Sequence, residues 1–184
     1  MRDKVETEFL ISHFLEAQMF GVGFLKSIWG TNTWLEVSQT KPKNETAYLR
    51  ATLGTEYQWN TDLYTIFEFH HNGAGSDKVS EYGLLPLKFA YQSGSVHLLG
   101  DHYFSTSFNH QWNPLLTIQY GGTYNIEDHS LLLNLMLSKS LTENSQIDLG
   151  SYFGVGHKGQ SLLIPMSEFA SYGTQFFLKY KHYF

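Results

Sequence analysis

The chain has 184 residues, of which 42% are hydrophobic and only 16% are charged, and its formal net charge is −5 at pH 7. This length allows one domain with a sizeable core, and the hydrophobic content excludes a disordered chain. The sequence has no cysteine, which excludes disulfides, thiolate metal sites and cysteine nucleophiles. Its 12 Lys and Arg residues are too few and too dispersed for a nucleic-acid-binding face, so we expect no nucleic-acid partner.

Most of the chain alternates apolar and polar residues with a period of two, which predicts half-buried β-strands. In the clearest segment, residues 47–59, the apolar Leu49 and Leu53 alternate with polar residues such as Arg50. For the first two segments, a helix over residues 6–20 is the alternative. The pattern predicts ten strands, at residues 4–11, 18–28, 32–40, 47–59, 62–72, 101–112, 115–126, 130–141, 145–156 and 173–184.

The connections between these strands are of two kinds. Turn-forming residues make four short connections, at 29–32, 59–62, 112–114 and 142–145. The connections that alternate with them are mostly longer, at 12–17, 41–46, 73–100, 127–129 and 157–172. We therefore expect an antiparallel meander with tight turns at one end and longer loops at the other.

The polar face of this meander carries charged and histidine side chains that a packed interior could hardly hold. They are Glu36, Arg50, Glu56, Glu68, His70, Asp148, Lys179 and Lys181. Aromatic residues stand where the apolar face meets the turns, as they do at the interfaces of membrane barrels. Most segments are long enough to cross a bilayer, and unpaired strand edges are not viable in lipid. We predict an all-β fold: a single domain over 1–184, an antiparallel up-and-down transmembrane β-barrel of about ten strands, with those eight side chains lining its lumen.

The last strand carries the most specific pattern in the sequence. Residues 173–184 end on Phe184, and apolar residues recur at alternate positions before it, at Phe176, Leu178 and Tyr180. This segment resembles the terminal strand of the outer-membrane β-barrel proteins of Gram-negative bacteria. The resemblance implies that these four residues form the signal read by the outer-membrane barrel assembly machinery. His182 stands where that family usually has an apolar residue.

The resemblance extends to larger, porin-like proteins through Trp112-Asn113-Pro114 and the hairpin that begins at 131–141. It implies a place in the bacterial outer membrane, contact with membrane lipid and passive passage of small solutes. Such barrels carry a secretory signal, and residues 1–6 have no apolar core of that kind. We therefore expect the sequence to be the C-terminal part of a larger barrel, with an independent ten-stranded barrel as the alternative.

Enzymatic and metal-dependent functions have weaker support in the sequence. His70 and His71 precede the 73–100 loop, and Asp101 and His102 follow it, but adjacent strand residues point to opposite faces. The nine histidines have no H-x-H or H-x-x-x-H spacing that would place two metal ligands on one face. We therefore expect no catalytic residue, no metal and no cofactor, and regard these groups as a solvated rim.

Two hypotheses concern the predicted lumen charges. They could set up a transverse field that orients solutes in a channel, or they could pair and plug a small barrel, for example Arg50 with Glu56 or Glu68. The sequence thus leaves three functions open. These are a porin-like solute channel, which we favour, a small closed barrel acting as membrane anchor or adhesin, and a soluble calycin-like barrel with an apolar ligand pocket.

Overall fold

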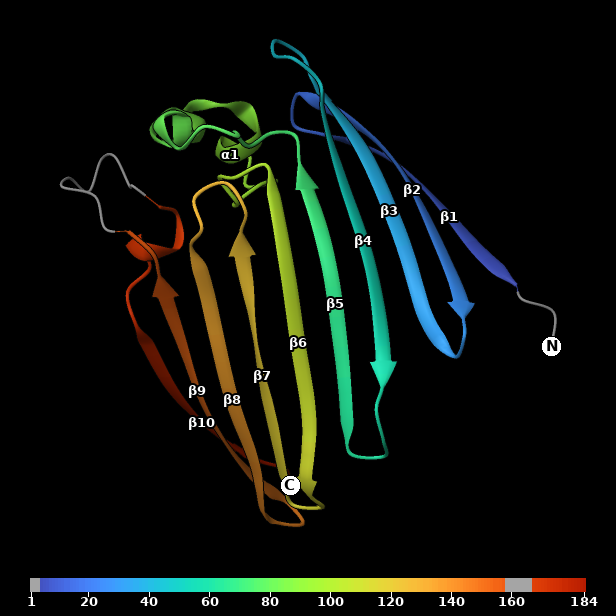
Figure 1. The fold of residues 1–184 in the computed structure, drawn as a ribbon, viewed down its shortest axis with the longest axis vertical. Helices are drawn as coiled ribbons and strands as arrows, with labels where there is room; N and C mark the ends of the chain where they lie inside the picture. The colour runs from blue at the N-terminus through green and yellow to red at the C-terminus, as the bar shows by residue number, and fades with distance from the viewer. Residues whose placement is uncertain (1–3, 158–166) are drawn as a thin grey trace.

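The computed structural model describes residues 4–157 and 167–184, and its main feature is one antiparallel sheet in which each strand pairs with its neighbour in sequence (Figure 1). The ten strands are β1 (Val5–Phe14), β2 (Ala17–Ile28), β3 (Thr31–Pro42), β4 (Tyr48–Gln58), β5 (Leu63–Asn72), β6 (His102–Asn113), β7 (Leu116–Asn125), β8 (Leu131–Thr142), β9 (Ser145–Val155) and β10 (Gln175–His182). All ten predicted strands are confirmed. The alternative helix over residues 6–20 is wrong, because β1 and β2 pair along their whole lengths there.

The two ends of the sheet differ in the length of their connections, as the sequence predicted. Four tight turns join strands at one end, and a long excursion between β5 and β6 stands at the other. This excursion holds the 3-10 helix η1 (Val79–Leu87) and the short helix α1 (Phe89–Gln92). A second 3-10 helix, η2 (Phe169–Ser171), precedes β10, and residues 158–166 of the predicted 157–172 connection lie outside the described residues. No helix in the described ranges is long and apolar enough to span a membrane.

One predicted connection is much shorter than expected. The sequence predicted a loop at 12–17, but β1 continues to Phe14 and β2 begins at Ala17. Leu15 lies between them with φ 50°, in the left-handed region that branched side chains rarely adopt. Because that position holds neither Gly nor Asn, the local sequence did not signal a two-residue turn.

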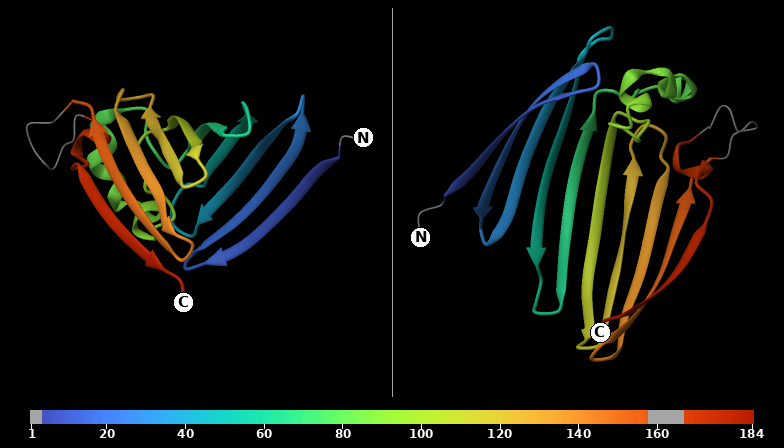
Figure 2. Two further views of the ribbon diagram at one scale, coloured as in Figure 1. Left: turned by 90° about the horizontal axis from the view of Figure 1, so that it is seen from below. Right: turned by 180° about the vertical axis from the view of Figure 1, so that it is seen from behind.

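The sheet is strongly curved but not closed (Figure 2). β1 pairs only with β2, and β10 pairs only with β9, so the described chain has two free strand edges. The closed barrel expected from the sequence is therefore not formed within these residues. The curvature of ten strands leaves β1 and β10 as separate rims, with η1 and α1 lying on the concave side between them.

The register separates apolar from polar side chains across the sheet. One row of paired residues reads Leu53, Phe69, Phe104 and Tyr124 from β4 to β7. The adjacent row reads Thr52, His70, Tyr103 and Asn125. Side chains of the second row and its neighbours contact the η1–α1 excursion, which places the polar row on the concave face and the apolar row on the convex face.

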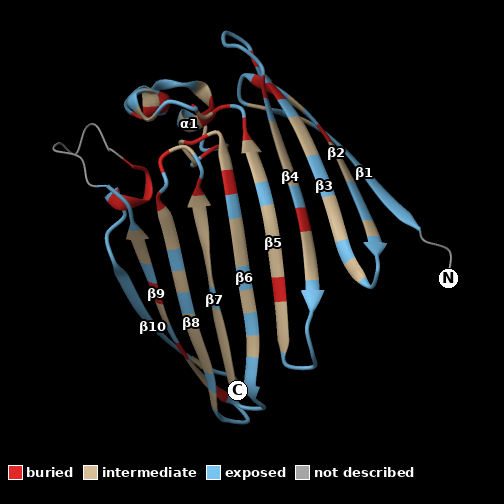
Figure 3. Cartoon of the chain, in the orientation of Figure 1, coloured by how far each residue is buried: buried red, intermediate tan, exposed pale blue. Residues whose placement is uncertain are grey.

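Few strand residues are buried, and the main apolar cluster is small (Figure 3). The cluster consists of Tyr48, Ala74, Ala90 and Val96, at the end where the excursion meets the sheet. The convex face remains uncovered: Ile11 is 82% exposed and Phe176 is 75% exposed. Contiguous exposed apolar patches commonly mark protein–protein or membrane contact surfaces.

Gly121 of β7 offers a test of the close strand packing. A Cβ at this position would lie 2.3 Å from the backbone carbonyl oxygen of Thr106 on β6, whereas a Cβ at Gly23 of β2 meets nothing nearer than 3.9 Å. We expect Gly121→Ala to destabilise the fold by about 1–3 kcal/mol through overpacking. Gly23→Ala should leave stability unchanged or raise it by about 0.5–1 kcal/mol. Urea unfolding followed by tryptophan fluorescence measures both, and equal midpoints for the two variants would contradict the register.

Candidate functional site

The eight side chains predicted to share a polar face do share one. Glu36 of β3 and His70 of β5 both stand opposite Thr52 of β4, and Asp148 of β9 stands opposite Lys179 of β10. Continuing the register from strand to strand places the whole set on the concave face. Its members are Glu36, Arg50, Glu56, Glu68, His70, Asp148, Lys179 and Lys181.

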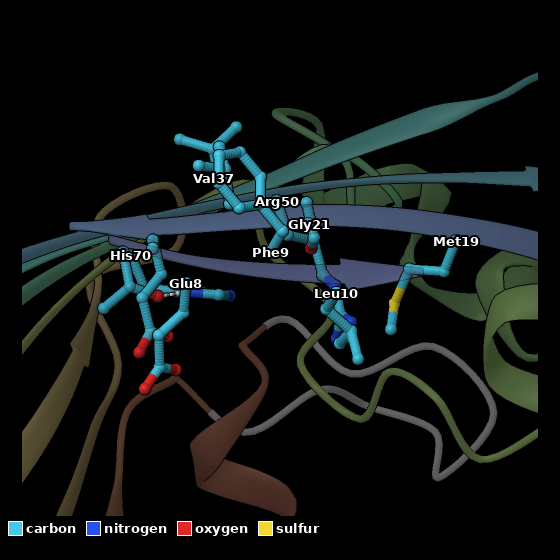
Figure 4. Close-up of a pocket in the computed structure, with 13 residues that line it drawn as sticks. Glu8, Phe9, Leu10, Met19, Gly21, Val37, Arg50 and His70 are labelled. Carbon is cyan, nitrogen blue, oxygen red and sulfur yellow. Dashed lines mark hydrogen bonds between the residues drawn. The ribbon is translucent and has the colours of Figure 1, made fainter. Parts of the chain in front are cut away.

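Three of these residues meet in a hollow of about 480 Å³ formed by β1 to β5 (Figure 4). Glu36, Arg50 and His70 line it, together with Glu8 of β1, so acidic and basic groups face the same space. Further lining positions are Leu10, Met19, Gly21, Gly23 and Thr52. The missing side chains at the two glycines of β2 leave room that larger residues would fill. His70 is held in place by a hydrogen bond between its Nδ1 and the Thr52 hydroxyl, at 2.9 Å.

The other predicted side chains lie away from this hollow. Lys181 forms an ion pair with Asp148, with 2.7 Å between Nζ and Oδ2, on the β9–β10 side of the sheet. Glu56 lies near the tight-turn end and accepts hydrogen bonds from Asn32 and Tyr64. The concave face therefore carries separate charged groups rather than one paired cluster.

Arg50 does not pair with Glu56 or Glu68 as the sequence suggested. Its Nη1 instead donates a hydrogen bond to the carbonyl oxygen of Ser95, at 2.9 Å, and within the described residues it forms no ion pair. Its Nε is buried and has no hydrogen-bond partner in the described part of the chain. Arg50 thus links the sheet to the excursion, a contact between residues 45 positions apart that strand alternation alone does not predict.

Further hydrogen bonds fasten the excursion to the concave face. The Tyr48 hydroxyl lies 3.1 Å from the Ser95 hydroxyl. The Asn72 side-chain amide donates to the carbonyl oxygens of Leu98 and Gly100, at 2.8 and 3.0 Å. The excursion is therefore a fixed part of the concave surface at the loop end of the sheet.

The same end contains a buried carboxylate that the sequence analysis missed. Glu168 is only 1% exposed. Its carboxylate accepts hydrogen bonds from the Leu99 backbone N–H at 3.0 Å, the Tyr103 hydroxyl at 2.5 Å and the Asn125 side-chain amide at 2.8 Å. Asp128 accepts the Glu168 backbone N–H. Burial raises the pKa of Glu168 above its ordinary value, despite these donors. The group joins three distant chain segments, and its partners lie 40 to 69 residues away, so no local motif could signal it.

The pair His70-His71 divides between the two faces, as the strand periodicity predicted. His71 points away from the hollow and meets His102, its directly paired neighbour on β6, with 3.2 Å between His71 Nδ1 and His102 Nε2. Asp101 completes a group in which one ligand atom from each residue lies within 4.8 Å of the others. The sequence predicted no metal site, because the two histidines are 31 residues apart and lack a recognisable spacing.

The residues of the predicted assembly signal lie together on the convex side of the last strand. Phe176, Leu178 and Tyr180 pair with Ser151, Leu149 and Ile147 of β9. Phe184 follows the end of β10 and packs edge-on against His182, whose ring also stacks on Tyr180. His182 therefore continues the aromatic row at the position where it departs from the family pattern.

Comparison with protein-family models, curated proteins and solved structures finds no match to this chain. Any statement about function therefore rests on the sheet, its two faces and the groups described above.

Glu168 generates a stability prediction. Glu168→Gln replaces an acceptor oxygen with an N–H₂ group facing buried donors, and we expect a loss of about 1–3 kcal/mol, measured by urea unfolding. Glu143→Gln, at the exposed β8–β9 turn, is the control and should change nothing.

The raised pKa of Glu168 also predicts a pH dependence. Its stabilising contribution is fully present below the ordinary glutamate pKa and is lost as pH rises through the raised value in the folded protein. Hydrogen exchange of the excursion should therefore be slower at pH 5 than at pH 8 after correction for the intrinsic rate. Glu168→Gln should flatten that difference, and an unchanged difference in the variant would contradict the assignment.

Proposed function

We propose that this chain is part of a bacterial outer-membrane β-barrel whose convex face contacts lipid and whose concave face lines a passage for small polar solutes. The observation that carries the proposal is the separation of an exposed apolar face from a charged, polar face over ten antiparallel strands. The strands have 8 to 12 residues, which suits the roughly 9–11 tilted residues that cross a bilayer.

The direction of curvature favours lipid contact over the soluble calycin-like alternative. A soluble barrel with an apolar pocket would turn its Leu and Phe side chains inward, onto the concave face. In this sheet, Leu53, Phe69 and Phe104 are on the convex face, and the concave face holds polar groups. Such an arrangement suits a hydrocarbon exterior and a hydrated interior.

The free edges of β1 and β10 favour a larger barrel over a small closed anchor or adhesin. Every backbone N–H and C=O must be paired inside a bilayer, so both edges need partner strands. We propose that additional strands complete the barrel, with this chain as its C-terminal part. In that arrangement Phe176, Leu178, Tyr180 and Phe184 form the signal for the barrel assembly machinery.

The passage would be narrowest at the loop end of the sheet. There the excursion lies over the concave face, hydrogen-bonded through Ser95 to Arg50, and next to the hollow lined by Glu36 and His70. Side chains of both charge signs suit small polar or zwitterionic solutes rather than large apolar ones.

The first experiment tests membrane insertion. The denatured chain is diluted into plain buffer and into lipid-like detergent, and its gel mobility is compared with and without boiling. We expect a boiling-sensitive mobility shift only from detergent, because the convex face needs an apolar environment. A compact β-rich monomer in plain buffer would contradict the proposal.

A second experiment tests passage and its dependence on charge. The complete barrel, with the additional strands that pair with β1 and β10, is added to a planar bilayer under a salt gradient, and we expect conductance whose reversal potential moves toward anion preference in Glu36→Lys. Glu143→Lys makes the same charge change at a tight turn outside the hollow and should move the potential much less. A complete barrel without conductance would contradict the solute passage and favour a structural barrel.

A further inference from the structure

His71 and His102 stand at the two points where the β5–β6 excursion leaves and rejoins the sheet. His71 is the next-to-last residue of β5, and His102 is the first residue of β6. The two are directly paired, their ring centroids are 4.9 Å apart, and they lie on the convex face, away from the hollow. Asp101 adjoins His102, and one of its carboxylate oxygens lies within 4.8 Å of a ring nitrogen of each histidine; its Oδ2 is 4.0 Å from His102 Nδ1.

A buried carboxylate holds His102 in one orientation. Glu127 has a side chain only 7% exposed, and its two oxygens accept hydrogen bonds from the His102 backbone N–H at 3.1 Å and from His102 Nδ1 at 2.8 Å. With Nδ1 engaged by Glu127, Nε2 is the ring nitrogen of His102 that faces His71. A carboxylate behind a histidine in this way is a common support for metal-ligating imidazoles.

The distance between the histidines fits a shared metal ion. His71 Nδ1 and His102 Nε2 are 3.2 Å apart, and two imidazole ligands at about 2.0–2.1 Å from a tetrahedral zinc ion stand roughly 3.3 Å from each other. His102 is the first residue of β6, at the loop end of the sheet, and its side chain is 38% exposed, so an ion has access from the solvent at that end. Two imidazoles with one carboxylate favour zinc or a similar transition metal over magnesium or calcium, which prefer oxygen ligands.

We propose that His71, His102 and Asp101 bind one divalent transition-metal ion such as Zn²⁺. Glu127 is the positioning residue for His102. The three ligands leave a fourth position for water. Because His71 precedes the excursion and Asp101 and His102 follow it, the bound ion ties the two ends of the excursion together. The site is separate from the proposed passage and does not depend on it.

The test uses the refolded, untagged chain and Co²⁺ as a spectroscopic probe for zinc. We expect one Co²⁺ per chain, visible absorption bands typical of nitrogen and oxygen ligands, and displacement of Co²⁺ by Zn²⁺. His71→Ala, His102→Ala and Asp101→Asn should each weaken binding at least tenfold. Glu127→Gln should weaken it about 10–100-fold, because it removes the support of a ligand rather than the ligand.

His110→Ala is the matched control. His110 is on the same strand and face as His102, and the structure places it beside Trp112 rather than in the proposed site. It should leave binding unchanged. Where an alanine variant does not refold, His71→Gln and His102→Gln replace it with the same expected loss.

Two results would overturn the proposal: no saturable Co²⁺ or Zn²⁺ binding to the refolded chain, or binding that survives in both His71→Ala and His102→Ala.

A second readout concerns the excursion itself. Trypsin cleavage at the exposed Lys78 should slow severalfold when Zn²⁺ is added to the original chain but not to His71→Ala. Equal protection of both proteins would also overturn it.

Discussion

The alternation of side chains between two faces of a strand is the constraint on which the rest of this structure depends. A slip of one residue in any pairing would move a whole strand's apolar set to the other face. The register avoids this across nine pairings, and its two irregularities, at Gln111/Asn113 and Ser140/Thr142, fall beside tight turns. Each strand therefore keeps its side chains on consistent faces, which gives a mostly apolar convex face and a concave face that carries the charged groups.

The loop end of the sheet depends on a different kind of interaction. Polar groups that are withdrawn from water need hydrogen-bond partners there. The single carboxylate of Glu168 accepts hydrogen bonds from three such groups. Arg50 and Asn72 provide further hydrogen bonds to the excursion. The surface that would constrict a passage is thus held by side-chain hydrogen bonds more than by apolar packing, which makes it sensitive to single substitutions and to pH.

The proposed solute passage and the proposed metal site lie close together at this end, on opposite faces of the sheet. The hollow with Arg50 and His70 opens on the concave face, whereas His71 and His102 face outward on the convex side. Adjacent residues of β5 therefore point toward the two separate proposed sites. Both sites border the excursion, so a metal ion at its base and solutes in the hollow would act on the same segment from opposite sides of the sheet.

The sequence by itself determined the ten strands, the end of the sheet at which the four tight turns lie, and the grouping of eight polar residues on one face, because alternation is a local property of each strand. It missed the two-residue turn at Leu15, where no glycine marks the left-handed conformation. Only the tertiary structure decided that the sheet stays open, that Arg50 binds Ser95 and that His71 meets His102. These outcomes depend on register and curvature accumulated over many strands and on the path of a long excursion, which the period-two pattern does not encode.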